Sequence, residues 1–359
     1  MTDRIMNIQT LGILGSGQLG RMLAIAASEM GISTHIYAPD AAGSPAGEVA
    51  STTTTASYDD EAALRRFGEQ VDAVISEFEN MPASSMAILA EYCDVAPGKT
   101  ALYVAQNRLR EKQLARQLGI RTAEFHAISS AEELAAAMAG LNGGQAILKT
   151  AEMGYDGKGQ VRLPSELSAD QIWDELGCAE AILEHFVEFT SEISVLVWRT
   201  PSGQSGCFPV SQNHHRNGIL SQTIAPAPDV DEQIAQAARN AALALADATE
   251  LTGVMAMEAF VTSDGEVLFN ELAPRPHNSF HWTIEGCLTS QFAQAVRVIC
   301  GWAAGDVTPT GTYVMDNLLG EDMDRLESLR QDGGGKLHLY GKNEARQGRK
   351  MGHYTYRRG

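Results

Sequence analysis

The chain has 359 residues, of which 44% are hydrophobic and 20% charged, a balance typical of a folded enzyme with two or three domains. Its net charge of −18 argues against broad binding to nucleic acid or to anionic membranes. Five cysteines without a C-x-x-C pair exclude a zinc ribbon or a disulfide framework. The scattered cysteines fit a reducing cytoplasm, and with no visible signal peptide or membrane-spanning stretch we expect a cytoplasmic protein.

The first hundred residues alternate predicted strands and helices, as in a parallel α/β layer. Strands are expected over 9–15, 33–39 and 71–78, and helices over 18–30, over 62–67 and after Pro82. A charged helix over 106–118 follows and is stopped by Gly119.

From Gln145 onward the pattern indicates mainly β structure. Strands are expected over 145–150, 160–163, 181–187, 191–199 and 206–213, helices near 168–177 and over 229–250, a hairpin over 254–272, and further helices after Phe280. The shifts in pattern predict three domains, over 1–104, 105–187 and 188–359.

Glycines follow the first predicted strand in the order Gly15-Ser16-Gly17-Gln18-Leu19-Gly20. This is the dinucleotide fingerprint G-x-G-x-x-G, and Asp40 stands where the ribose-binding acid of a NAD site belongs. Because glycines at a helix N-terminus bind any phosphate, the segment predicts a phosphate site without naming its ligand. A nicotinamide-dependent oxidoreductase therefore stays open as one hypothesis.

The predicted hairpin places two acids opposite each other. Asp264-Gly265 is a strong signal for a two-residue type I′ turn between strands over 254–262 and 266–272. In that register Glu258 faces Glu271, and like charges about 5 Å apart destabilise a sheet. A Mg²⁺ ion bridging the two carboxylates would remove the penalty. The alternative is an ordinary hairpin with two solvated acids, and a one-residue change of loop would break the register.

A second glycine-rich loop, over 152–160, connects two predicted strands and carries Gly154, Gly157 and Gly159. Such a loop brings backbone N–H groups against phosphate oxygens and lets a flap open and close. Lys149, at the end of the preceding strand, could reach the same phosphates. The alternative is a flexible hairpin tip.

The last 24 residues, 336–359, are basic in an acidic protein. They hold seven Lys or Arg against the single acid Glu344, so this segment is +6 and the remainder −24. Either the segment is a solvated tail, or it forms an anion site; leucines and tyrosines among the charges suit the second.

Four segments carry a resemblance to a known family: 15–22 (GSGQLGRM), 77–80 (EFEN), 154–160 (GYDGKGQ) and 270–283 (NELAPRPHNSFHWT). With them the chain resembles the ATP-grasp superfamily and, within it, the family of 5-(carboxyamino)imidazole ribonucleotide synthases. The resemblance implies an α/β ATP-grasp fold with an N-terminal parallel α/β domain, a small β-rich lid domain and a C-terminal α+β domain. Two residues depart from the family pattern, Lys158 in place of Arg and Phe280 in place of Gly.

The resemblance also implies an activity. ATP phosphorylates bicarbonate, the resulting carboxyphosphate releases CO₂, and the exocyclic amine of 5-aminoimidazole ribonucleotide captures it. ATP and Mg²⁺ are the implied cofactors and a homodimer the implied assembly. Another ATP-grasp ligase, such as a formate-dependent ribonucleotide transformylase, and a non-catalytic nucleotide-binding module stay open beside it.

Individual residues acquire roles through the same resemblance. The ATP-binding set is Arg108, Lys149, Gly154, Tyr155, Asp156, Gly157, Lys158, Gly159, Gln160, Glu184, His185, Phe186, Val187, Glu192, His215, Asn270 and Glu271. The substrate-binding set is Gln18, Glu77, Tyr155, Asp156, Lys342 and Arg349. The catalytic set is Lys149, Asp156, Arg275, His277 and Asn278, and the metal ligands are Glu258 and Glu271.

Several of these roles are more specific. Glu184 and the edge of the strand over 181–187 would read the adenine, and Glu192 would hold the ribose hydroxyls. Lys342 and Arg349 would bind the ribonucleotide phosphate together with Gln18. Adjacent residues on a strand face opposite sides, so only one of His214 and His215 enters the site, and we choose His215. Glu77 and Glu79 share a face, and we prefer Glu77 as the substrate contact because it stands at the carboxyl end of the strand. We expect His277 to position substrate rather than act as a general base.

Overall fold

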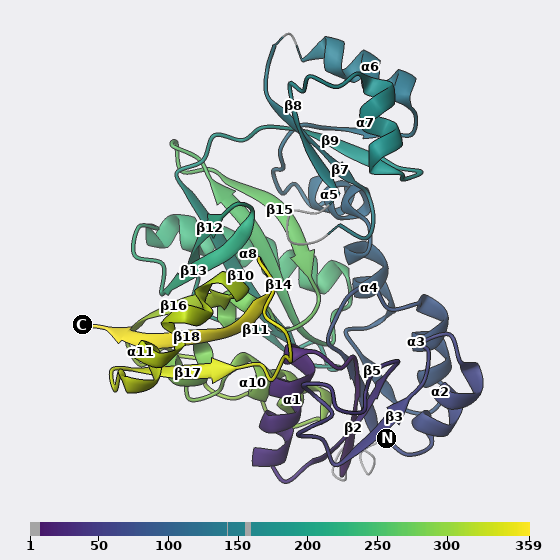
Figure 1. Cartoon of the computed structure of the whole chain (residues 1–359), viewed down its shortest axis with the longest axis vertical. Coiled ribbons are helices and arrows are strands. Elements are labelled where there is room, and N and C mark those ends of the chain that lie inside the picture. Colours follow the sequence, from purple (N-terminus) through teal and green to yellow (C-terminus); the bar gives the residue numbers. More distant parts are fainter. Residues whose placement is uncertain (1–7, 142, 155–158) are drawn as a thin grey trace.

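The computed structural model describes residues 8–141, 143–154 and 159–359. The predicted ligands Tyr155, Asp156, Gly157 and Lys158 lie outside the described residues. Three sheets, each from a different part of the chain, make up the described structure (Figure 1). The predicted α/β class and the expected succession of a parallel layer, a small β-rich unit and a larger C-terminal unit are confirmed.

The N-terminal sheet is parallel and has the strand order β3-β2-β1-β4-β5. Its strands are β1 (Thr10–Leu14), β2 (Ser33–Ala38), β3 (Thr52–Thr55), β4 (Ala73–Ser76) and β5 (Asp94–Ala96), and its helices α1 (Gln18–Glu29), α2 (Glu61–Gly68) and α3 (Ala83–Leu89). β1 and β4 are buried almost throughout, as continuous apolar runs in a parallel sheet should be. The short, polar strand β3 has no such run, and the sequence did not predict it.

Two helices lead from this sheet to the lid unit, α4 (Lys99–Ala105) and α5 (Arg108–Gln117), in place of the single helix predicted over 106–118. Asn107 separates them, because its side chain accepts hydrogen bonds from the N–H groups of Leu109 and Arg110 and caps α5.

The lid unit stands apart at the top of Figure 1 and has the strand order β6-β9-β7-β8. Its elements are β6 (Phe125–Ile128), α6 (Ala131–Gly140), β7 (Ala146–Thr150), β8 (Gln160–Leu163), α7 (Ala169–Leu176) and β9 (Ala181–His185). The two helices pack on the sheet through Leu134, Leu148 and Ile172. β9 pairs on both sides, with β6 and β7, so the expectation that it offers an open edge to adenine is wrong.

The large sheet has the order β15-β14-β10-β12-β13-β16-β18-β17, with β11 paired to β10. Its strands are β10 (Ser191–Arg199), β11 (Ser205–Cys207), β12 (Ser211–Arg216), β13 (Ile219–Ala225), β14 (Gly253–Val261), β15 (Val267–Ala273), β16 (Thr312–Leu319), β17 (Gly335–Leu339) and β18 (Lys350–Arg358). The strand predicted over 206–213 is in fact split between β11 and β12. Because β17 and β18 belong to the sheet, the basic segment 336–359 is no solvated tail.

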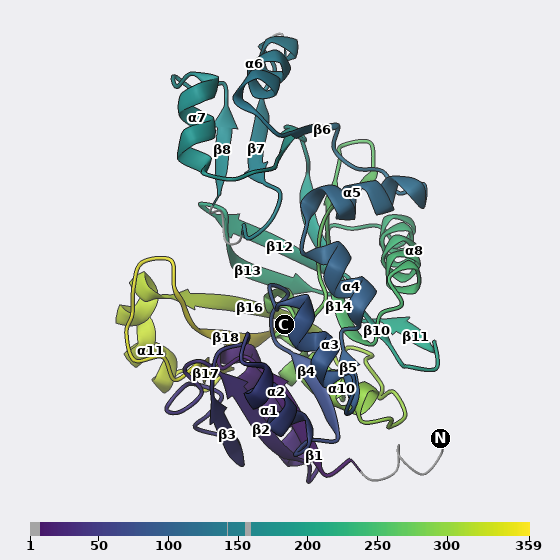
Figure 2. The same cartoon turned by 90° about the vertical axis from the view of Figure 1, so that its right-hand side faces the viewer.

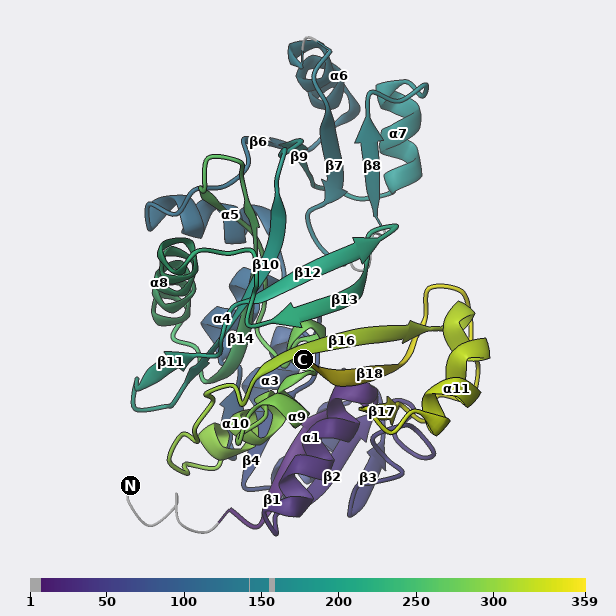
Figure 3. The ribbon, with the colours of Figure 1, turned by 90° about the vertical axis from the view of Figure 1, so that its left-hand side faces the viewer.

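The large sheet lies between the other two units (Figure 2). Helix α8 (Glu232–Ala248) covers one face, and α9 (Thr283–Gly286) and α10 (Gln291–Ile299) lie on the other, where α10 packs beside α1 (Figure 3). A short helix, α11 (Leu326–Gln331), joins β16 to β17. All five cysteines are free thiols. Within the described ranges no helix has both the length and the apolar character that crossing a membrane requires.

The β14–β15 hairpin differs from its prediction in the length of its loop and in a bulge, and the two resulting register shifts cancel. The Thr262 N–H donates to the Glu266 carbonyl, and the Gly265 N–H donates to the Thr262 carbonyl. Gly265 has φ +83°. The loop therefore has three residues and not two. Pairing near the loop is therefore one residue off the predicted register. A β-bulge at Asn270 shifts it back, and Glu258 faces Glu271 as predicted.

Candidate active site

A cavity of about 340 Å³ opens where the N-terminal sheet, α5 and the large sheet meet. Eight of the residues predicted for the site line it: Gln18, Glu77, Arg108, Gly154, Glu271, Arg275, His277 and Asn278. Glu77 follows the carboxyl end of β4, the edge at which parallel α/β sheets bind ligands. Residues up to 260 positions apart in the sequence thus converge on one space.

Glu271 lines this cavity, and Glu258 lies directly opposite it on the neighbouring strand. Burial and then the charge of Glu271 raise the pKa of Glu258 to about 7. Arg108 Nη2 lies 3.5 Å from Glu271 Oε2, and His277 Nε2 lies 3.5 Å from Glu258 Oε1. The bulge at Asn270 interrupts the regular alternation of side chains beside Glu271, as the proposed role of Asn270 as a ligand requires. Two hard carboxylates that repel each other fit a divalent cation between them.

A third carboxylate, which the sequence reasoning missed, lies beside this pair. Glu111 on α5 is buried, and its Oε1 accepts a hydrogen bond of 3.1 Å from the Leu272 N–H. Burial, followed by the charge of Glu271, holds the pKa of Glu111 well above its ordinary value. The available signal was spacing, because Arg108, Glu111 and Lys112 share one face of a helix.

Glu184 is held between two lysines. Lys112 Nζ lies 2.6 Å from its Oε1 and Lys149 Nζ 2.5 Å from its Oε2. Burial opposes ionisation, but the two ammonium groups outweigh it and lower the pKa of Glu184 to about 2. Lys112 is nearly fully buried and also donates to the Phe269 carbonyl at 3.2 Å. It is a second residue that the sequence reasoning missed.

The rest of the predicted adenosine site lies on the lid and on β10 and β12. His215 Nδ1 forms an ion pair with Glu192, and although burial lowers the pKa of His215, this bond raises it overall. The His185 and Phe186 N–H groups bond to the carbonyls of Glu124 and Gln145, so these amides are already engaged.

The described ends of the glycine loop lie close to the predicted phosphate ligands. Arg108 Nη2 donates to the Gly154 carbonyl at 3.3 Å, and Gln160 pairs with Lys149 across β7 and β8. Gly159 has φ +69°, and a Cβ there would come within 2.9 Å of Thr150 Oγ1, so glycine is required.

The first glycine-rich segment is not the phosphate site that the sequence predicts. The Glu77 carboxylate accepts hydrogen bonds of 2.5 Å from both Gly17 N–H and Gly20 N–H. A Cβ on Gly15 would come within 2.3 Å of Glu77 Cγ, so the glycines make room for this side chain. The protein's own carboxylate thus takes the amides that a pyrophosphate would use.

Glu79, the acid not chosen as substrate contact, orients a predicted catalytic residue. Arg275 Nε lies 2.5 Å from Glu79 Oε2, and Nη2 lies 3.2 Å from Oε1. Burial opposes ionisation of Glu79, yet Arg275 lowers its pKa below the ordinary value. A bidentate pair of this kind fixes the plane of the guanidinium.

His277 and Asn278 complete the wall of the cavity. Gln291 bonds to the N–H of His277 at 2.8 Å and to its carbonyl at 2.9 Å, and Ser279 Oγ lies 2.8 Å from His277 Nδ1. Burial and then Arg275 hold the pKa of His277 well below its ordinary value, so its imidazole is neutral. Both amide atoms of the buried Asn278 lack a hydrogen-bond partner among the described residues. Phe280 is fully buried against Phe208.

The basic C-terminal segment reaches the cavity through Lys350, the first residue of β18, which the sequence reasoning did not single out. Lys342 Nζ donates to the Lys350 carbonyl at 2.8 Å, and Arg349 Nη1 donates to the Glu344 carbonyl at 2.9 Å. Among the described lining residues this segment therefore contributes Lys350 and neither of the two predicted cations.

Comparisons with known proteins agree with this arrangement. Family models match in chain order: a ribonucleotide synthetase preATP-grasp domain over 8–106, an ATP-grasp domain over 113–292, and a phosphoribosylaminoimidazole carboxylase C-terminal domain over 314–358. The N5-carboxyaminoimidazole ribonucleotide synthase of Brucella melitensis is 45% identical over 96% of this chain and 95% of its own length. The chain belongs to this family of ATP-grasp enzymes.

Solved structures of the family superpose closely. The ADP complex of an N5-carboxyaminoimidazole ribonucleotide synthetase has a TM-score of 0.92 at 43% identity, covering 97% of this chain and 92% of that one. The Aspergillus clavatus enzyme in complex with ADP and 5-aminoimidazole ribonucleotide has a TM-score of 0.88 at 28% identity, covering 98% and 94%. The predicted family is thereby confirmed, while the three domain boundaries and the individual site roles stay predictions.

Proposed function

We propose that the chain catalyses the ATP- and bicarbonate-dependent carboxylation of the exocyclic amine of 5-aminoimidazole ribonucleotide. The observation that carries the proposal is the cavity, in which Glu271, opposed by Glu258 on the next strand, lies with Arg275, His277 and Asn278. The first group is suited to a nucleotide triphosphate and its metal, and the second to a small anion and a polar heterocycle. The Aspergillus clavatus relative bound to ADP and 5-aminoimidazole ribonucleotide supports both assignments.

ATP would be held between the lid and the large sheet. Lys149 and Arg108 would neutralise its phosphates, and Glu192 paired with His215 would hold the ribose. Mg²⁺ would bind to Glu258 and Glu271, with Asn270 close by, and when bound it neutralises the charge that develops on the transferring phosphoryl group. Phosphoryl transfer depends mainly on positioning and charge neutralisation, which these fixed groups supply.

Bicarbonate and the carboxyphosphate derived from it would lie against Arg275, whose guanidinium Glu79 keeps in one orientation. Asn278 would bind the aminoimidazole or the carboxylate with its two unpartnered amide atoms. His277, neutral and fixed by Gln291 and Ser279, would accept or donate one hydrogen bond rather than supply charge. Carboxyphosphate hydrolyses readily, so the cavity must exclude water while CO₂ is released and captured.

ADP release with and without each substrate tests the proposal. With ATP and Mg²⁺ present, we expect ADP and the carbamate product only when both bicarbonate and 5-aminoimidazole ribonucleotide are added, and none with formate in place of bicarbonate. ADP release that is indifferent to the nucleotide, without carbamate, would refute the substrate assignment.

Single substitutions test the individual roles in the same assay. Glu271→Gln should abolish turnover, whereas Glu188→Gln at an exposed position should not change it. Near-normal turnover of Glu271→Gln would contradict the metal assignment. We also propose that the protein is a cytoplasmic homodimer. Light scattering on the purified chain gives the mass of the assembly and so tests the homodimer.

A further inference from the structure

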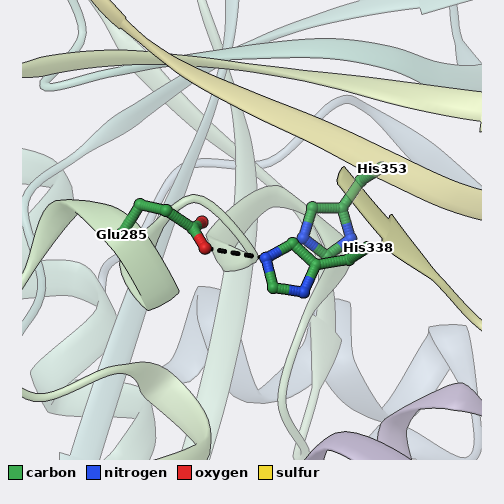
Figure 4. Close-up of side chains that lie close together, drawn as sticks. All are labelled: Glu285, His338 and His353. Carbon is green, nitrogen blue, oxygen red and sulfur yellow. Dashed lines mark hydrogen bonds and ion pairs between the residues drawn. The ribbon is translucent and has the colours of Figure 1, made fainter. Parts of the chain in front are cut away.

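Two histidines and a glutamate gather just behind the cavity wall, apart from all the residues assigned above. Glu285 belongs to α9, His338 to β17 and His353 to β18 (Figure 4). One possible ligand atom from each lies within 4.8 Å of the other two. The site roles proposed for ATP, substrate and Mg²⁺ use none of these three residues.

Strand pairing holds the two imidazoles together. His338 and His353 are direct cross-strand partners in β17 and β18, and their rings stack with centroids 4.5 Å apart and an interplanar angle of 16°. Figure 4 shows the Glu285 carboxylate facing the edge of this stack. His338 Nε2 lies 2.7 Å from Glu285 Oε1.

An ion pair between His338 and Glu285 does not account for the whole cluster. Glu285 Oε2 and His353 Nε2 are both buried and lack a hydrogen-bond partner in the described part of the chain. A buried polar atom left without a partner costs about 1–3 kcal/mol, so two in one cluster call for a ligand. A cation that accepts a lone pair from each would satisfy both.

The surroundings prepare His353 to bind a metal. His353 is fully buried, and its ring lies 5.0 Å from that of His281 and 4.5 Å from that of His338. Tyr340 Oη lies 2.9 Å from His353 Nδ1 and is itself buried. A metal-binding histidine commonly donates the N–H of its other ring nitrogen to an acceptor, and Nδ1–H donating to Tyr340 Oη would leave the Nε2 lone pair for the ion.

We propose that Glu285, His338 and His353 bind a divalent transition-metal ion of the zinc class. Two imidazole nitrogens and one carboxylate oxygen are a usual ligand set for Zn²⁺, with water in a fourth position, whereas Mg²⁺ prefers oxygen alone. Zn–N bonds of about 2.1 Å place tetrahedral ligands about 3.4 Å apart, so ligand atoms 4.8 Å apart must approach by about 1.4 Å. Rotation of the three side chains would have to supply this movement and tilt the two stacked rings toward a common ion.

Such an ion would have a structural effect on the active site. It would tie the β17–β18 hairpin, which carries Lys350 into the cavity, to α9, which follows the Arg275–Asn278 segment. His281 links the two places, because it lines the cavity and its ring lies 5.0 Å from that of His353. The inference is independent of the proposed function, since binding requires neither ATP nor bicarbonate.

Titration of the metal-free full-length chain with Co²⁺, without nucleotide, tests the site. We expect one Co²⁺ per chain with the visible absorption of a four-coordinate site, displaced by Zn²⁺ but not by Mg²⁺. Glu285→Gln and His353→Ala should weaken Co²⁺ binding at least tenfold. Tyr340→Phe, which removes only the orienting hydrogen bond, should weaken it about tenfold to a hundredfold. The control His214→Ala should leave it unchanged.

Thermal unfolding provides a second readout that does not depend on turnover. Zn²⁺ should raise the melting temperature of the wild-type chain and leave that of Glu285→Gln unchanged. Glutamine keeps the size of the side chain, so circular dichroism of this variant shows whether it is folded. Equal Co²⁺ affinity for the wild type and a folded Glu285→Gln, or no Co²⁺ binding by the wild type at millimolar concentration, would overturn the proposal in favour of a simple ion pair.

Discussion

Replacing Glu258 by glutamine should stabilise the metal-free protein at alkaline pH while abolishing turnover. The carboxyl group is held by burial and by Glu271 at a pKa of about 7, above its ordinary value of 4.5. Ionising it in the folded protein is therefore unfavourable. The difference of about 2.5 corresponds to at most about 3 kcal/mol, at 1.36 kcal/mol for each pKa unit.

The sign of the pH dependence follows from proton linkage. The folded protein binds this proton more tightly than the unfolded chain, so the protonated carboxyl contributes stability below pH 4.5, and that contribution is lost as the pH rises through about 7. Glutamine cannot ionise, so the variant does not lose this contribution to stability as the pH rises. The variant should therefore match the wild type near pH 5 and exceed it near pH 8.

Thermal unfolding between pH 5 and pH 8, with Glu188→Gln as an exposed control, measures the effect. We expect Glu258→Gln to melt several °C above the wild type at pH 8, given about 2–4 °C per kcal/mol for a domain of this size. Mg²⁺ with ADP should reverse the order, because only the wild type gains a bridged ion pair. Equal melting temperatures at pH 8 without metal would refute the buried, repelling pair.

Further substitutions test the roles of Lys112 and Lys350, which the sequence alone did not reveal, and the structural role of Glu77. Lys112→Met leaves Glu184 with a single cation and should raise KM for ATP about tenfold, with a smaller effect on KM for 5-aminoimidazole ribonucleotide; equal effects would indicate a general structural role. Lys350→Met should raise KM for the ribonucleotide more than Arg349→Met does, because Lys350 lines the cavity, and the reverse order would favour Arg349 as the phosphate ligand. Glu77→Gln should lower the melting temperature through weaker bonds to the α1 amides, by an amount equivalent to about 1–3 kcal/mol, and an unchanged value would contradict the structural role of this acid.

Local patterns predicted those parts of the fold in which one segment carries its own signal. Strand β10 and the helix α7 with its capping residue Ser168 follow the sequence pattern within one or two residues. β3 and β5 went unnoticed because four threonines and a three-residue strand contain no apolar run. Their pairing comes from neighbouring strands, which is information that a single segment does not contain.

Charged residues of the site were hardest to find where their role depends on distant parts of the chain. Lys112 becomes a partner of Glu184 only when α5 packs against the lid sheet, and Lys350 faces the cavity only because β18 crosses the large sheet beside β16. On the sequence, both are ordinary lysines in charged surroundings. The glycines at the start of α1 suggested a phosphate site for the same reason. The acid that accepts hydrogen bonds from the Gly17 and Gly20 amides, Glu77, stands 57 residues beyond Gly20.

The hairpin of β14 and β15 shows how a correct pairing of two acids can follow from an incorrect turn. A three-residue loop moves the pairing by one residue, and one residue is enough to turn every side chain of a strand to the other face. Without compensation Glu258 would face Asn270, and Glu271 would leave the cavity. At the bulge, Asn270 has no direct partner on β14, so the pairing moves by one residue and Glu258 again faces Glu271. It also interrupts the alternation by which the adjacent Asn270 and Glu271 would face opposite sides of the strand. Loop and bulge are therefore coupled: a loop of Asp264-Gly265 alone keeps Glu258 opposite Glu271 only if the bulge is lost, and Asn270 and Glu271 then return to the regular alternation of a strand.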